Sequence, residues 1–84
     1  MNEYKMKNSE ELNQAIEIFM QHYQPAKSIS ESDEELETYE IMRKIVSHLG
    51  NKGINVRMVH NRLMEKGFQY IYIVNEFKWL LKNR

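Results

Sequence analysis

Three histidines, at positions 22, 48 and 60, are the side chains best suited to bind a metal or to exchange a proton near neutral pH. They occur in no HxxxH or HExxH spacing, which would place two ligands on one face of a helix. The chain has no cysteine, so thiolate ligands, disulfides and a cysteine nucleophile are excluded. We therefore expect no metal site, and we expect His22 and His48 to have structural roles near helix ends.

The glycines and carboxylates give no sign of catalysis. The three glycines form neither a GxGxxG nor a GxxxxGK loop that would cradle a phosphate. The carboxylates crowd at the expected starts of helices, where acidic side chains complement the helix dipole, so no pair of them suggests a general acid and base. The sequence thus predicts a protein that is not an enzyme, with no catalytic residue, no cofactor and no evident small-molecule substrate.

The charges are segregated along the chain, although the formal net charge is zero. Residues 1–40 contain ten acids and three bases, a net charge of −7, whereas residues 41–84 contain nine bases and two acids, a net charge of +7. Clustered cations attract phosphates and release their counterions, so the second half suggests a face that binds a polyanion. In the alternative interpretation, the two halves fold against each other and neutralise their charges.

Several side chains of the second half are of the types that contact nucleic acid. Arginine and asparagine can bond bidentately to guanine and adenine, and lysine contacts phosphate. These side chains are expected either to point outward from a helix over residues 56–66 or to lie in the hairpin after it. They form the predicted nucleic-acid-binding site: Arg57, His60, Asn61, Arg62, Lys66, Lys78 and Lys82.

The first element that would position these side chains is an amphipathic helix. Apolar residues from Leu12 to Tyr23 recur with a 3.6-residue period, which predicts a helix over residues 9–23. Asn8 and Glu11 have the spacing of a capping box at its start. Pro25 prevents the helix from continuing, and residues 24–32 are expected to form a loop.

Two more helices are expected to follow. Ser32 and Glu35 have the spacing of a second capping box, which predicts a helix over residues 33–49, with Gly50 as its C-cap. Asn55 can cap a third helix over residues 56–66. Gly67 and Phe68 then suggest a Schellman ending, in which Phe68 packs back on the helix.

The end of the chain has two interpretations. Residues 69–74 are rich in aromatic and β-branched side chains, so they are expected to form a strand. If Asn75 and Glu76 form a turn, residues 77–82 return as a second strand and complete a β-hairpin, the interpretation that we favour. In the alternative, Asn75 caps a terminal helix over residues 76–84, whose cationic end suits a helix C-terminus.

The run Val59-His60-Asn61-Arg62-Leu63-Met64-Glu65-Lys66-Gly67-Phe68 resembles the end of the recognition helix in winged-helix domains, and the expected hairpin resembles the wing. The resemblance covers residues 34–84. It implies a helix-turn-helix fold whose third helix enters the major groove of DNA, while the wing contacts phosphate or the minor groove. Many winged helices bind proteins instead, so the resemblance leaves the partner open.

Together these patterns predict one small α+β domain over residues 1–84, mainly helical, with a three-helix core and a C-terminal β-hairpin. The longest uncharged stretches have nine residues, far fewer than the ~20 that cross a bilayer, and we expect neither a membrane span nor a signal peptide. The lack of cysteine fits a cytoplasmic location.

Two functions follow from this prediction. The first is DNA binding by a small regulatory or accessory domain, through the third helix and the hairpin. The second is a non-catalytic protein–protein interaction module that binds a protein partner or forms a homo-oligomer. The zero net charge, Met58, Met64 and the hairpin aromatics are compatible with such a module, and the outer edge of the hairpin could pair with another copy.

Overall fold

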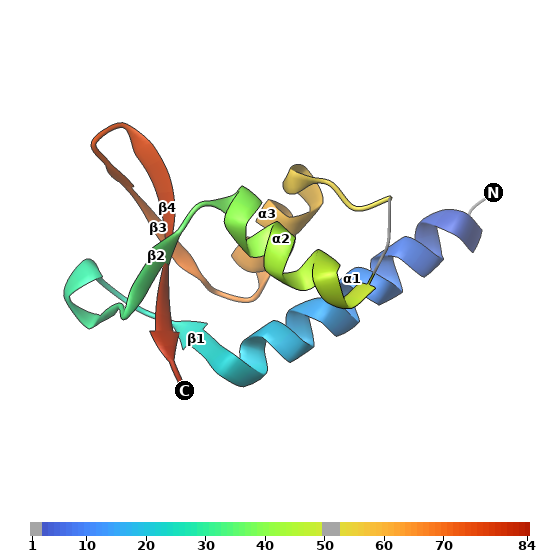
Figure 1. Ribbon diagram of the computed structural model, residues 1–84, viewed down its shortest axis with the longest axis horizontal. Coiled ribbons are helices and arrows are strands. Elements are labelled where there is room, and N and C mark those ends of the chain that lie inside the picture. The colour runs from blue at the N-terminus through green and yellow to red at the C-terminus, as the bar shows by residue number, and fades with distance from the viewer. Residues whose placement is uncertain (1–2, 50–52) are drawn as a thin grey trace.

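The computed structural model describes the backbone of residues 3–49 and 53–84 and the side chains of residues 10–45 and 53–84 (Figure 1). Three α-helices, one 3-10 helix and a four-stranded antiparallel sheet form the described chain. Their order is α1 (Glu3–His22), β1 (Tyr23–Pro25), the 3-10 helix η1 (Ile29–Glu31), β2 (Glu34–Leu36), α2 (Thr38–Leu49), α3 (Val56–Glu65), β3 (Gln69–Ile73) and β4 (Glu76–Asn83). Within these residues, no helix is long and apolar enough to cross a membrane.

Strand β4 is the centre of the sheet and pairs with each of the other three strands. The backbone oxygen of Leu80 accepts from Ala26 beside β1, and that of Leu81 accepts from Asp33 beside β2. Because successive strand residues direct these groups to opposite edges, β1 and β2 lie on opposite sides of β4. Gln69 pairs with Leu80, so β3 shares the edge of β4 on which β1 lies.

The expected fold, a mainly helical three-helix core closed by a hairpin, is therefore wrong in its architecture. The three helices and the hairpin form, but the hairpin is part of a sheet that also includes segments from the first half of the chain. Strands β1 and β2 have three residues each, too few for an alternating pattern to show in the sequence. Their pairing with β4 is a long-range interaction that local propensity does not report.

Helix α1 begins at Glu3, so Asn8 and Glu11 lie inside the helix and do not cap it. Its predicted apolar stripe is buried, with Leu12 and Ile16 fully hidden from solvent. The helix ends one residue earlier than expected, because Tyr23 begins β1 and pairs with Asn83. The segment expected to be a loop thus contains a strand and the 3-10 helix η1.

Helix α2 begins at Thr38, five residues after the predicted start. The Ser32 hydroxyl donates to the Glu35 carboxylate, a bond between side chains that differs from the side-chain-to-backbone bonds of a capping box. The backbone N–H of Ser32 donates to Ile29, and that of Asp33 donates to Leu81 across the sheet. Pairing with β4 therefore makes residues 34–36 a strand, although the local signals predict that they begin a helix. At the observed start of the helix, the side chain of Glu40 accepts from the backbone N–H of Glu37 at Oε1, at 2.8 Å. The expected C-cap, Gly50, lies outside the described residues.

Helix α3 and its ending agree with the sequence prediction. Asn55 Oδ1 accepts from the N–H of Met58 at 3.0 Å and caps the helix. Gly67 has φ +89°, its N–H donates to Met64, and the N–H of Phe68 donates to Leu63, which is the bond pattern of a Schellman motif. Leu63 and Phe68 both belong to the buried core.

The C-terminal hairpin is present and the alternative terminal helix is absent, since residues 76–83 form β4. The turn lies one residue earlier than expected, because Ile73 pairs with Glu76 and leaves Val74 and Asn75 as the two-residue loop. Both loop residues have positive φ, at 50° and 65°, as a type I′ turn requires. In Figure 1 the hairpin extends beyond the helices.

The core lies between the helices and one face of the sheet. Trp79 and Leu81 point to this face and are packed with apolar residues of all three helices. Leu80 points to the other face and is nevertheless buried. The connection from β1 to β2 passes from one edge of β4 to the other, and it includes Ala26, which is also buried and whose N–H donates to Leu80.

Candidate functional site

Helix α3 brings together three of the seven residues predicted to bind nucleic acid. Arg57 and Asn61 are exposed on its outer side, one turn apart, and His60 is half-buried between α3 and the hairpin. The ring of His60 lies 5.2 Å from that of Trp79 and 5.5 Å from that of Phe77. Packing in this aromatic cluster thus explains why His60 is half-buried, although the sequence analysis placed it on the outward face.

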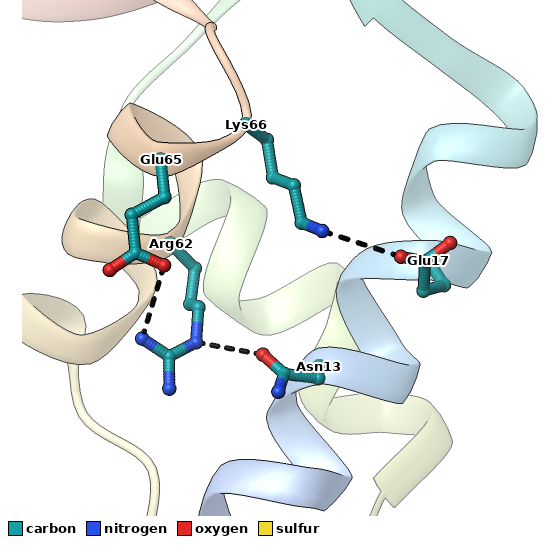
Figure 2. Close-up of polar contacts among 5 residues, drawn as sticks. All are labelled: Asn13, Glu17, Arg62, Glu65 and Lys66. Atoms are coloured by element: carbon teal, nitrogen blue, oxygen red, sulfur yellow. Dashed lines mark hydrogen bonds and ion pairs between the residues drawn. The ribbon is translucent and has the colours of Figure 1, made fainter.

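Two other predicted residues turn toward α1 (Figure 2). Arg62 Nε donates to Asn13 Oδ1 at 2.8 Å, and its Nη1 lies 3.5 Å from Glu65 Oε1. Lys66 Nζ lies 3.4 Å from Glu17 Oε2. These contacts join α3 to α1 and direct both cations at partners within the molecule.

The hairpin lysines lie on the face of the sheet opposite Trp79. Residues 78 and 82 alternate with Trp79 and Leu81 along β4, so their side chains leave the sheet on the side away from the main core. Lys78 Nζ lies 3.4 Å from Glu76 and 3.8 Å from Glu37, whereas Lys82 is exposed. The seven predicted residues therefore do not share one surface.

The segregated charges meet in part across the fold. The Lys66–Glu17 and Lys78–Glu37 pairs each join a base of the second half to an acid of the first half. Tyr23 Oη donates to Glu34 Oε2 at 3.0 Å and links β1 to β2. Burial raises the pKa of the Tyr23 phenol above 10.0, and the hydrogen bond and charge of Glu34 raise it further.

An aromatic surface that the sequence analysis did not assemble covers one face of the hairpin. The rings of Tyr70 and Phe77 stack with centroids 4.4 Å apart, and Tyr72 meets Phe77 edge-on at 5.6 Å. Exposure increases toward the turn: 0% for Trp79, 41% for Tyr70, 70% for Tyr72 and 88% for Val74. The core of the protein thus continues along the hairpin into a solvent-exposed apolar surface.

The outer edge of β3 is the second unusual feature of the hairpin. Ile73 and Glu76 flank the turn and pair with each other, so their backbone N–H and C=O groups point inward, as do those of Ile71. By alternation, the backbone groups of Tyr70 and Tyr72 point away from β4. No strand in the described parts of the chain pairs with β3 on that side.

The other outer strands are protected against further pairing. Proteins protect sheet edges with short strands, prolines and charged side chains. Strand β1 has three residues and contains Pro25, and β2 has three residues and contains Glu34 and Glu35. Strand β3 has five residues, and the chain has neither a charge nor a proline from residue 67 to residue 75. The outer edge of β3 is therefore open to strand addition.

The molecule also has a groove of about 390 Å³ between α1 and α2. It is lined mainly by apolar side chains, namely Ala15, Ile18, Phe19, Tyr23 and Ile45, together with His22 and Lys44. Among the described side chains, those of residues 10–45 and 53–84, no group of three histidine, aspartate or glutamate residues is placed to hold a metal ion. The groove thus offers an apolar surface with two basic side chains at its lining.

No family model, curated protein or solved structure matches this chain. The hairpin combines an exposed aromatic face with an unprotected strand edge, and both features belong to the same five residues of β3.

Proposed function

We propose that this protein is a protein-interaction module whose contact element is the β3–β4 hairpin, and that it binds an extended segment of its partner by strand addition to β3. The observation that carries the proposal is the open edge of β3, five residues long and free of charge and proline. In strand addition, main-chain hydrogen bonds contribute affinity and the side chains of alternate residues contribute specificity.

The side chains of β3 suit such a partner on both faces. Tyr70 and Tyr72 present aromatic rings on the helical side, where an aromatic or β-branched residue of an added strand would pack beside them. Ile71 and Ile73 are half-buried on the opposite face and are available to apolar residues of the same strand. An added segment with apolar residues at successive positions would therefore be favoured over a charged one.

The hairpin is also held rigidly enough to act as a template. Trp79 is fully buried, and its Nε1 donates to Thr38 Oγ1 at 2.7 Å. The stacked rings of Tyr70 and Phe77 join the two strands on the same face. A docking strand would therefore pair with a preformed edge and would cost little ordering of the hairpin itself.

The proposal is tested by selecting binders from a library of random decapeptides. We expect enriched peptides to be apolar and extended, and to shift the backbone amide NMR signals of residues 69–73. The matched variants are Tyr72→Pro, which removes an outward N–H that β4 does not use, and Tyr72→Ala, which keeps it. Binding should be lost in Tyr72→Pro and only weakened in Tyr72→Ala. Peptides that bind wild type and Tyr72→Pro equally would contradict the proposal.

Nucleic-acid binding is the second candidate, and the exposure of Arg57 and Asn61 one turn apart on α3 favours it. Their side chains are of the types that contact base edges, and the exposed ring of Tyr72 on the hairpin is of the type that stacks on an unpaired base. A titration of labelled duplex and single-stranded DNA at low salt separates the two functions. Binding at protein concentrations on the order of 100 µM or below, weakened by salt and by Arg57→Ala, would favour nucleic acid; its absence would leave the interaction module.

A further inference from the structure

We propose that the strand added to β3 is β3 of a second copy of this chain, paired antiparallel about a twofold axis at Ile71. This inference rests on the proposed function, since it names the partner of the same strand edge.

The free backbone groups of β3 are arranged symmetrically. Those of Tyr70 and Tyr72 point away from β4, while those of Ile71 between them point toward it. An antiparallel copy centred on Ile71 places Tyr70 opposite the partner's Tyr72, and Tyr72 opposite the partner's Tyr70. Each of these two pairs exchanges both N–H···O bonds, so the outward groups of both tyrosines are satisfied in both copies.

The side chains are complementary to themselves in this register. The two tyrosine pairs lie side by side on the helical face, where cross-strand aromatic neighbours stabilise a sheet. On the other face, Ile71 meets the partner's Ile71, and Gln69 meets the partner's Ile73. No charge faces a like charge, because residues 67–75 carry none.

The nearest charged residues in the sequence beyond β3 are Lys66 on one side and Glu76 on the other. Lys66 is paired with Glu17, and Glu76, which lies on β4 opposite Ile73, is paired with Lys78. Antiparallel pairing about Ile71 therefore brings no unpaired like charges together at the ends of the contact. The formal net charge of the chain is zero, and two copies therefore do not repel each other at a distance. These two features favour a second copy over an arbitrary extended segment.

The contact is small, because one five-residue strand contributes most of it. Small interfaces form weak, concentration-dependent complexes. We therefore expect the apparent mass in sedimentation to rise from one chain toward two chains between about 10 µM and about 1 mM. Tyr72→Pro should stay monomeric over the same range, and Tyr72→Ala should still associate, although at a higher concentration.

Single cysteines test the register directly, because the chain contains none of its own. At a pair of strand residues that share no hydrogen bonds, the Cα atoms lie ~4.5 Å apart, within the range of a disulfide. Ile71→Cys should therefore form disulfide-linked dimers under mild oxidation. Ile73→Cys, on the same face, is the matched control: it lies about 13 Å from its own copy along the strands and should stay monomeric. A mixture of Gln69→Cys and Ile73→Cys should give the mixed dimer.

The outcomes distinguish this inference from the proposed function. Equal cross-linking of Ile71→Cys and Ile73→Cys, or a monomer at about 1 mM, would overturn pairing with a second copy. If selected peptides still bind wild type and fail to bind Tyr72→Pro, the edge binds strands and only the identity of the partner is wrong. If neither copies nor peptides bind, both proposals fail.

Discussion

Trp79 is the residue at which the helices and the sheet meet. It is fully buried in the centre of β4, stands opposite Leu36 of β2 and Tyr70 of β3, and packs edge-on against His60 of α3. Its indole N–H is a polar group in an apolar core, and the Thr38 hydroxyl at the start of α2 is its partner. One hydrogen bond therefore sets the position of α2 against the sheet.

Thr38→Val removes this acceptor while keeping the shape of the side chain. We expect the variant to lose about 1–3 kcal/mol of unfolding free energy, because the indole N–H stays buried without a partner. Thr38→Ser keeps the hydroxyl and should lose clearly less unfolding free energy than Thr38→Val. Urea unfolding followed by the fluorescence of the single tryptophan measures both. A Thr38→Val protein as stable as wild type would show that the bond contributes nothing.

Tyr23 and Glu34 make stability depend on pH in the alkaline range. Burial, with Glu34 beside it, raises the pKa of the folded-state Tyr23 phenol above its ordinary value of 10.0, so the folded protein holds this proton more tightly than the unfolded chain. The resulting stabilisation is present below pH 10 and is lost as the pH rises through the folded-state pKa.

Tyr23→Phe should therefore cost about 1 kcal/mol near pH 8, where the hydrogen bond to Glu34 is intact. The difference between wild type and the variant should shrink as the pH rises above about 10, because wild type then loses the same bond. Urea unfolding at a series of pH values tests this. A difference that stays constant up to about pH 11 would mean that Tyr23 does not titrate in this way.

At the scale of elements, the hairpin turn contains backbone strain. Val74 has φ 50°, a conformation that β-branched residues disfavour because Cβ approaches the following carbonyl oxygen. Its side chain is almost wholly exposed, so burial does not compensate for this cost. The pairing of β3 with β4 on either side holds the turn in place. The strain is therefore local to the tip of the hairpin.

Val74→Asn should relieve this strain and stabilise the protein by about 1 kcal/mol, since asparagine tolerates the left-handed region. Val74→Ile is the control, because it is also β-branched and should give no gain. Thermal unfolding by circular dichroism compares them. If both variants raise the melting temperature equally, relief of the left-handed backbone strain does not explain the gain.

At the scale of the whole molecule, β4 connects the two halves of the chain. It pairs with β1 and β2 from the first half and with β3 from the second, and it contributes Trp79 and Leu81 to the core. The backbone N–H of Arg84 donates to His22 at the end of α1. Most of the sheet therefore consists of contacts between residues distant in sequence, whose formation costs loop-closure entropy.

A chain shortened to residues 1–75 should lose cooperative unfolding. Without β4, none of the other three strands has a partner, and the helices lose the surface on which their apolar residues pack. Circular dichroism during heating should show a gradual loss of helix instead of a sigmoidal transition. Full-length Lys82→Ala, which changes an exposed residue of β4, should keep the transition. A cooperative transition in the shortened chain would show that the helices form a core of their own.

Some elements follow from short-range signals, and the sequence predicts these correctly. Helix α3 has its cap at Asn55 and its Schellman ending at Gly67 within a few residues of its own ends. The hairpin requires only that β3 and β4 be rich in strand formers and joined by a short loop. Such features are decided by the steric and hydrogen-bonding preferences of neighbouring residues, and these preferences are visible in a single sequence.

The tertiary structure alone decided the rest. Ser32 and Glu35 have the spacing of a helix cap, yet β4 pairs with the residues after Ser32, because hydrogen bonds to a buried central strand outweigh a local preference worth about 1 kcal/mol. The tertiary structure also decided where the residues of the predicted nucleic-acid-binding site lie. The sequence predicts cations on one surface, but Arg62 and Lys66 bond to α1 and Lys78 lies across the sheet, because the charge of a side chain does not determine which way the fold turns it.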